Sequence, residues 1–63
     1  MNSNKIVKIS GRIIVCNKSF GFIKEGQQFY CIGTKDDYVY LFSPEYNFEF
    51  KININLLKNF NIY

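Results

Sequence analysis

The sequence contains no histidine, no tryptophan and no alanine, and it has a single proline. Histidine is the most common general base in enzymes and the most common metal ligand, so most hydrolytic and metal chemistry lacks its usual residue here. Ser10, Ser19 and Ser43 have no histidine that could activate them as nucleophiles. The four glycines lie too far apart for a phosphate-binding glycine motif. We therefore expect no catalysis, no metal and no cofactor.

Cysteine is also scarce, with Cys16 and Cys31 alone. Two thiols without histidine cannot complete a tetrahedral zinc site, and the spacing is not that of a CxxC pair. We expect both side chains to act as small hydrophobic core residues. A disulfide requires their strands to be adjacent, which the sequence leaves open.

Long apolar runs are missing as well. No segment approaches the roughly 18 apolar residues of a membrane helix, and the start MNSNKIVKIS lacks the apolar region of a signal peptide. We expect a cytoplasmic protein with no membrane partner. The 63 residues suit one domain spanning 1–63, with the polar residues 1–4 frayed.

The charge is unevenly distributed along the chain. The net charge is +3, and residues 1–24 carry five basic residues and no acidic one. Such a segment could meet phosphates or an acidic protein surface. However, Lys, Asn, Ile, Phe and Tyr supply 36 of the 63 residues, and all five have AT-rich codons. Codon bias is therefore an equally good source of the lysines and aromatic rings.

What the chain does have is a series of short strand patterns. Residues 5–16 and 27–33 are rich in strand-forming residues, and Gly11 predicts a bend within the first segment. Residues 17–26 read as a loop, residues 34–37 as a turn, and Pro44-Glu45 as another turn. No segment has a long helical period, so four to six short strands predict an all-β barrel or sandwich.

Two of these segments show a period of two. Residues 48–54 alternate between apolar and polar side chains, and residues 38–42 alternate between aromatic and aliphatic ones. In residues 48–54, Phe48, Phe50, Ile52 and Ile54 form a predicted core face, and Glu49, Lys51 and Asn53 face water. In residues 38–43, one face carries Val39 and Leu41, and the other carries Tyr38, Tyr40 and Phe42. One of these two faces must be core. If it is the Val39 face, the three rings form an exposed stripe, which a lone domain rarely leaves bare.

The order of elements resembles that of small SH3-like β-barrel proteins common in bacteriophages and Firmicutes. The matching segments are 14–17 (IVCN), 23–30 (IKEGQQFY), 36–41 (DDYVYL), 48–51 (FEFK) and 56–60 (LLKNF). The resemblance implies a five-stranded SH3-like barrel with one short 3-10 turn near residues 55–59. In such a barrel, Phe20 and Phe22 would lie in the loop that lines the ligand groove, where they plug the open end or contact a partner.

A second, partial resemblance is to cold-shock domains, which have an OB-like barrel. It covers residues 11–23 (GRIIVCNKSFGFI) and 37–43 (DYVYLFS). Val15 stands where that family has tryptophan, and Ser19 where it has glycine. The resemblance implies base stacking on Phe20 and Phe22, with nearby lysines holding phosphates.

Three functions follow as hypotheses. The first is a non-catalytic binding module of phage or mobile-element origin that binds and inhibits a host protein, for example in an anti-CRISPR or similar anti-defence role. Its partner-binding residues would be the rings and charged rim residues Phe20, Phe22, Tyr38, Tyr40, Phe42, Lys18, Lys24, Asp36 and Asp37.

The second hypothesis is a single-stranded nucleic-acid-binding protein. It would use Lys5, Lys8, Arg12, Lys18, Phe20, Phe22 and Lys24. The third is a self-associating structural barrel, such as a homodimer, because the edge strands of very small barrels pair readily with one another.

Overall fold

The fold is a single antiparallel sheet of five short strands. The computed structural model describes residues 9–63, so Lys5, Lys8 and the predicted frayed end and first strand segment before Ile9 lie outside the described residues. The strands are β1 (Ile13–Cys16), β2 (Gln28–Lys35), β3 (Tyr38–Ser43), β4 (Phe48–Asn53) and β5 (Phe60–Ile62). The 3-10 helix η1 (Ile54–Asn59) joins β4 to β5. The predicted all-β class and the 3-10 turn before the last strand are both confirmed.

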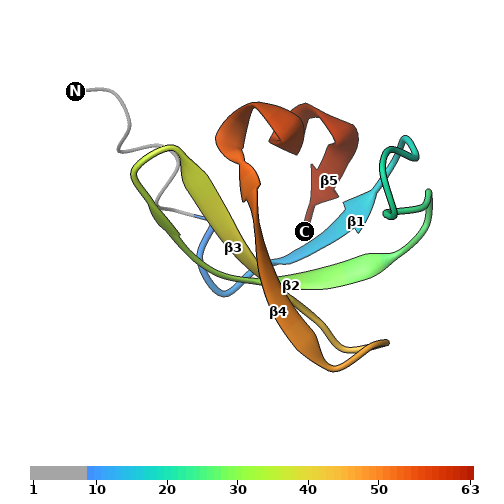
Figure 1. Ribbon diagram of the computed structural model, residues 1–63, viewed down its shortest axis with the longest axis horizontal. Coiled ribbons are helices and arrows are strands. Elements are labelled where there is room, and N and C mark those ends of the chain that lie inside the picture. The colour runs from blue at the N-terminus through green and yellow to red at the C-terminus, as the bar shows by residue number, and fades with distance from the viewer. Residues whose placement is uncertain (1–8) are drawn as a thin grey trace.

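The strand order across the sheet is β4-β3-β2-β1-β5 (Figure 1). Strands β1 to β4 are neighbours in the order of the chain. Strand β5 returns to the other side of β1, where Cys16 lies opposite Phe60. Strands β4 and β5 form the two edges and are not paired with each other. The predicted closure of the sheet into a barrel is therefore not present as a continuous ladder of hydrogen bonds.

The core lies on one face of this sheet. Alternate residues of each strand point to it, as the period of two requires. In β3, Val39 and Leu41 are fully buried, so the face left open by the sequence is now assigned: Tyr38, Tyr40 and Phe42 point outward. The remaining buried apolar residues are Ile9, Ile14, Cys16, Ile23, Phe29, Cys31, Ile52 and Phe60.

The expected core face of β4 is only partly buried. Ile52 is buried, and Phe50 and Ile54 are half-buried against the core. Phe48, by contrast, is 40% exposed, so its assignment to the core was wrong. The physical reason is that β4 is an edge strand and Phe48 is its first residue, so neighbours cover this ring from one side alone.

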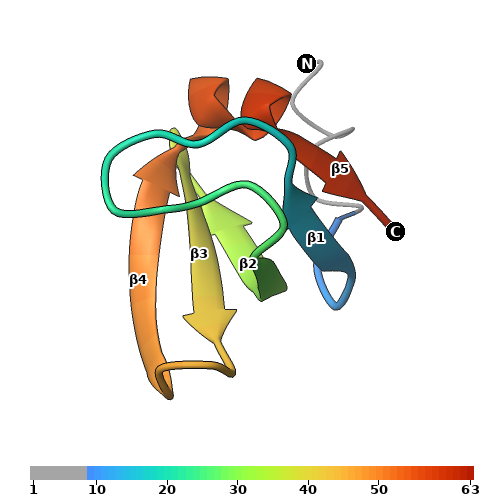
Figure 2. The same ribbon diagram turned by 90° about the vertical axis from the view of Figure 1, so that its right-hand side faces the viewer.

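The loop between β1 and β2 lies across the core face of the sheet (Figure 2). It contains a small hairpin in which Phe20 and Ile23 exchange two backbone hydrogen bonds of 2.9 Å. Gly21 takes a φ of 55° at the first position of this two-residue turn, where glycine avoids a steric penalty. The hairpin delivers the buried Ile23 side chain to the core.

Both cysteines are free and buried, as expected for small core residues. Cys16 N donates to Gln27 O, whereas Cys31 N donates to Arg12 O, so the two thiols lie four positions apart along the β1–β2 ladder. Their strands are adjacent, but their positions in the register are not. A disulfide between them is therefore incompatible with this pairing of strands.

Candidate protein-binding surface

A row of large apolar side chains crosses the outer face of the sheet, on the side away from the core. Tyr30 lies opposite Ile13 of β1 and opposite Phe42 of β3. Tyr63 extends the row, because its N–H donates to Ile13 O at 2.8 Å. We call these four residues the outer row. Ile13 is 48% exposed and Tyr30 is 47% exposed, so the row is open to solvent.

Further apolar side chains widen the outer row along β2 and β3. Ile32 and Tyr38 are exposed, and Tyr40 is half-buried. The Lys51 ammonium lies 4.4 Å from the centre of the Tyr38 ring, a cation–π contact that places a positive charge at the margin of this surface. Scattered exposed apolar residues are ordinary on a protein, whereas contiguous apolar patches are typical of interaction surfaces.

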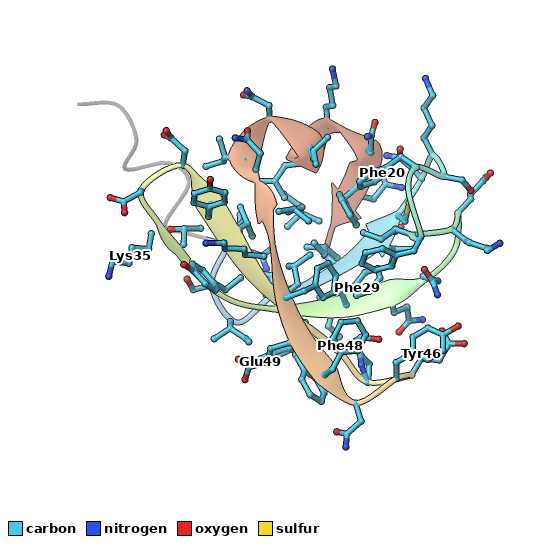
Figure 3. The ribbon with its side chains drawn as sticks, in the orientation of Figure 1. Phe20, Phe29, Lys35, Tyr46, Phe48 and Glu49 are labelled. Atoms are coloured by element: carbon cyan, nitrogen blue, oxygen red, sulfur yellow. The ribbon has the colours of Figure 1, made fainter. Side chains whose placement is uncertain are left out.

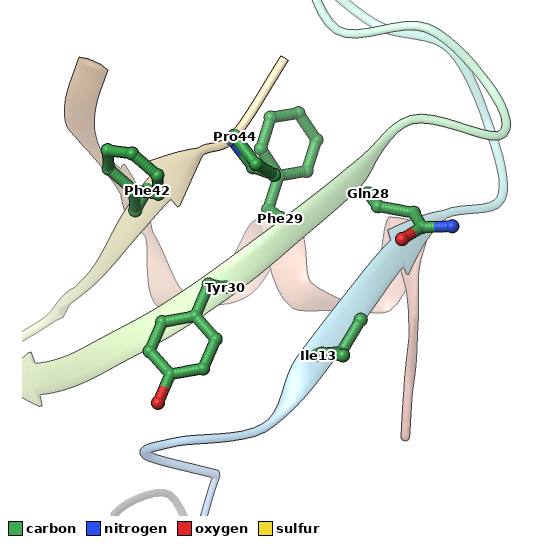
Figure 4. A pocket seen from close by; sticks show the side chains of 6 residues that line it. All are labelled: Ile13, Gln28, Phe29, Tyr30, Phe42 and Pro44. Carbon is green, nitrogen blue, oxygen red and sulfur yellow. The ribbon is translucent and has the colours of Figure 1, made fainter. Parts of the chain in front are cut away.

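The outer row contains a shallow cavity of about 300 Å³ (Figure 4). Ile13, Tyr30, Phe42 and Pro44 supply most of its wall, together with Gln28 and Phe29. The wall carries no charged side chain, and its polar groups are the Gln28 amide and the Tyr30 hydroxyl. The apolar wall of this hollow suits one or two apolar side chains, because it lacks the several converging polar groups that orient a cofactor.

The sequence contained a signal for this surface that strand assignment alone did not use. In β1 and β2, both faces are apolar: Ile14 and Phe29 enter the core, while Ile13, Tyr30 and Ile32 face outward. A strand that is apolar on both sides is typical of a sheet covered on both sides. Within residues 9–63, the outer side chains remain exposed, so nothing described here covers them.

The predicted partner-binding rings divide between two different faces. Tyr38, Tyr40 and Phe42 are on the outer face, whereas Phe20 and Phe22 are on the core side. The Phe20 ring packs edge-on against Phe60 at 5.7 Å, and Phe22 packs against Phe50 at 5.6 Å. Phe20 therefore covers the end of the core, while Phe22 is still 67% exposed. Figure 3 shows Phe20 and Phe29 on the same side of the sheet.

The predicted charged residues are also separated. Asp36 and Asp37 form the exposed turn between β2 and β3, beside Tyr38 and the outer face. Lys18 and Lys24 are exposed in the β1–β2 loop, at the opposite end of β2. The acidic pair therefore borders the aromatic surface, and the lysine pair borders the loop hairpin.

Arg12 lies apart from both lysines. Its Nε donates to the Tyr63 backbone oxygen at 3.0 Å, so it borders the outer row. Of the described basic residues predicted to hold phosphates, Lys18 and Lys24 therefore lie in the same loop as Phe20 and Phe22, whereas Arg12 lies elsewhere. Residues missed by the sequence prediction are those that β1, β2 and the end of the chain add to the surface: Ile13, Tyr30, Ile32 and Tyr63.

Among residues 9–63, no three His, Cys, Asp or Glu side chains come together in a way that could hold a metal ion. Burial raises the pKa of the Cys31 thiol, against a weaker opposing effect of its contact with the Gly33 carbonyl. The thiolate, which is the nucleophilic form, is thereby disfavoured.

Comparisons with protein-family models, curated proteins and solved structures found no match. In the part of the chain that the structure describes, no helix has both the length and the apolar character needed to cross a membrane. Inference about function therefore depends on the geometry of the outer face.

Proposed function

We propose that the chain is a non-catalytic binding module whose outer face docks onto a partner protein. The observation that carries the proposal is the outer row, in which four large side chains from β1, β2, β3 and the segment after β5 lie side by side. Ile13, Tyr30 and Tyr63 are exposed, and Phe42 is half-buried. Aromatic residues that line a dry central hollow are typical anchors of protein interfaces.

The surroundings of the outer row suit such an interface. Charged side chains lie at its margins rather than at its centre: Arg12 beside Tyr63, Lys51 over Tyr38, and Glu49 opposite Phe42. A polar rim around an apolar centre excludes water from the central contacts and fixes the orientation of the partner. The expected partner presents one or two apolar side chains to the hollow and charges of both signs around them.

The proposed SH3-like barrel fold is compatible with a binding role. A β4-β3-β2-β1-β5 order with a 3-10 helix before the last strand is what the resemblance to small SH3-like barrels implies. We propose that the chain has this fold with an incompletely paired barrel. On the same resemblance, the partner is a host protein that the module binds and inhibits in the cytoplasm. Fold alone does not fix function, so the outer face is what the experiment must test.

The test is affinity capture from host cells with three matched baits. The baits are wild type, Tyr30→Ser in the outer row and Phe22→Ser in the loop. The two variants each remove one exposed ring, and the two rings lie on opposite faces. One protein should be retained by wild type and by Phe22→Ser and lost with Tyr30→Ser. Retention of that protein by Tyr30→Ser would overturn the docking role of the outer face.

The same experiment separates the single-stranded nucleic-acid alternative. If the retained material is RNA or DNA, it should be released by nuclease and by raised salt, because phosphate contacts weaken as the salt concentration rises. It should also depend on Phe22 rather than Tyr30. That pattern would replace a protein partner with a nucleic acid.

A further inference from the structure

The outer edge of β4 is long and unpaired within the described chain. Strand β4 pairs with β3 over six consecutive residues without a bulge, and no strand among residues 9–63 pairs with its other side. Figure 2 shows β4 at one border of the sheet, and β5, at the other border, has three residues. Proteins usually protect such an edge with proline, a bulge, a very short strand or charged side chains. Strand β4 has six residues without proline or bulge, and its charged side chains are Glu49 and Lys51.

The backbone groups that β4 turns outward can be identified from its ladder. Ile54 N donates to Asp37 O at 2.8 Å. Hydrogen-bonded pairs alternate along an antiparallel ladder, so Ile52 and Phe50 also bond to β3. The N–H and C=O groups of Glu49 and Lys51 therefore point away from the sheet, ready to accept another strand.

We infer that β4 pairs in antiparallel fashion with β4 of a second copy of this chain, around a two-fold axis at Phe50. The outward backbone groups of Glu49 then exchange hydrogen bonds with those of Lys51 in the second copy, and the reverse pair forms on the other side of the axis. The side chains of such a pair point to the same face of the sheet, so each copy contributes one carboxylate and one ammonium to two cross-strand ion pairs.

The charges of Glu49 and Lys51 also favour this register over the two registers in which the two-fold axis lies one residue away. Moving the axis to Glu49 places two carboxylates opposite each other, and moving it to Lys51 places two ammonium groups opposite each other. Like charges directly across a ladder are destabilising. Glu49 has the uncharged Phe42 opposite it within its own sheet, so its carboxylate is available to the second copy.

The core side of β4 supports the same pairing. Phe50 would lie opposite Phe50 of the second copy, and Phe48 opposite Ile52. Phe48 is 40% exposed and packs against Phe50 with ring centres 5.4 Å apart. Pairing would cover this exposed ring, which the isolated chain leaves at the border of its core. The inference rests on the edge of β4, whereas the outer row lies on β1, β2, β3 and Tyr63. The two proposals share Glu49 and Lys51, which border the outer row, so capture with Tyr30→Ser and sedimentation of the charge variants test them separately.

Charge reversal tests the pairing by sedimentation equilibrium over protein concentrations from about 1 µM to about 1 mM. Wild type should form dimers within that range. Glu49→Lys and Lys51→Glu should each weaken dimerisation by about tenfold or more, because both ion pairs become repulsive. An equimolar mixture of the two variants should form a heterodimer, and the double variant Glu49→Lys/Lys51→Glu should recover the homodimer.

The matched control is Lys58→Glu, which reverses one exposed lysine in the last turn of η1 and should leave the dimer unchanged. A wild type that remains monomeric throughout the range overturns the inference. So does a dimer that both single reversals leave intact, or two weakened variants that fail to associate when mixed. Circular dichroism of each variant establishes that it is folded, and the mixed sample tests the register even if one variant alone is destabilised.

Discussion

Tyr30 lies directly opposite Phe42 in the β2–β3 ladder, on the face of the sheet that points away from the core. Each ring has a neighbour along its own strand that is buried: Cys31 after Tyr30 and Leu41 before Phe42. The core face and the proposed binding face are therefore opposite faces of the same two strands. Substitutions on the two faces should have different consequences.

Tyr30→Ser should abolish partner binding at little cost to stability. The side chain is 47% exposed, so its loss removes few core contacts. We expect the free energy of unfolding to fall by less than about 1 kcal/mol, within the range of strand propensities at exposed positions. Urea unfolding measures the stability, and capture of the partner measures binding. A loss of stability of several kcal/mol would show instead that Tyr30 is a structural residue.

Leu41→Ala, on the core face, should instead lower the stability strongly. Leu41 has no exposed surface, and its truncation leaves a cavity that its close-packed neighbours cannot fill. The free energy of unfolding should fall by about 2 to 5 kcal/mol. For a domain of this size that is enough to unfold much of the population at ordinary temperature. A cooperative thermal transition close to that of wild type would contradict the assignment of the core face.

Particular residues show how far the sequence alone could lead. The alternation in residues 38–43 separated Leu41 from Tyr40 correctly, because a period of two follows from strand geometry alone. Which of the two faces is core was left undecided, since both are apolar and the choice depends on β2 and β4, which flank this strand. Tyr30 does not stand out in the sequence, because the segment 27–33 is apolar on both faces and lacks the alternation that separates core from surface.

The misassignment of Phe48 has a different cause. Its sequence pattern is indistinguishable from that of Ile52, which is buried. What separates them is the position of β4 at the border of the sheet, a property of topology that periodicity cannot report. Similarly, the separation of Phe22 from Tyr38 depends on how the β1–β2 loop crosses the sheet, and the composition of that loop does not encode its path.

The two rings of the loop hairpin should differ in their effect on stability. Phe20 is half-buried and packs edge-on against Phe60, so Phe20→Ala should lower the free energy of unfolding by about 1 to 3 kcal/mol. Phe22→Ala removes a ring that is 67% exposed and should lower it by less than about 1 kcal/mol. Denaturant unfolding of the two variants side by side gives the comparison. Equal losses would contradict the packing of the loop over the core.

Glycine substitutions offer a matched pair in which backbone conformation is the main variable. Gly26 has a φ of 93° and open space around its α-carbon, so Gly26→Ala should destabilise by about 1 to 2 kcal/mol through backbone strain. Gly33 has no positive φ, and an added methyl group would make an ordinary contact of 3.6 Å with Ser10 Oγ. Gly33→Ala should therefore be neutral or stabilise by up to about 1 kcal/mol. Thermal unfolding should rank the variants in that order, and a reversed order would refute the loop geometry.

The buried thiol of Cys31 should make the protein less stable in alkaline solution. Burial raises its pKa above the ordinary value of 9.0, so the unfolded chain releases this proton at a lower pH than the folded chain does. The stabilising contribution is complete below the ordinary pKa and is lost as the pH rises through and beyond it.

Urea unfolding at about pH 8 and about pH 10, in the presence of a reductant, measures this loss against that of Cys31→Ala. The variant has no thiol to ionise, so its stability should fall less between the two pH values, although its truncated side chain lowers stability at both. All other side chains are the same in both proteins, so their contributions cancel in the comparison. Identical falls in wild type and variant would mean that the Cys31 thiolate is tolerated in the folded core, contrary to its complete burial.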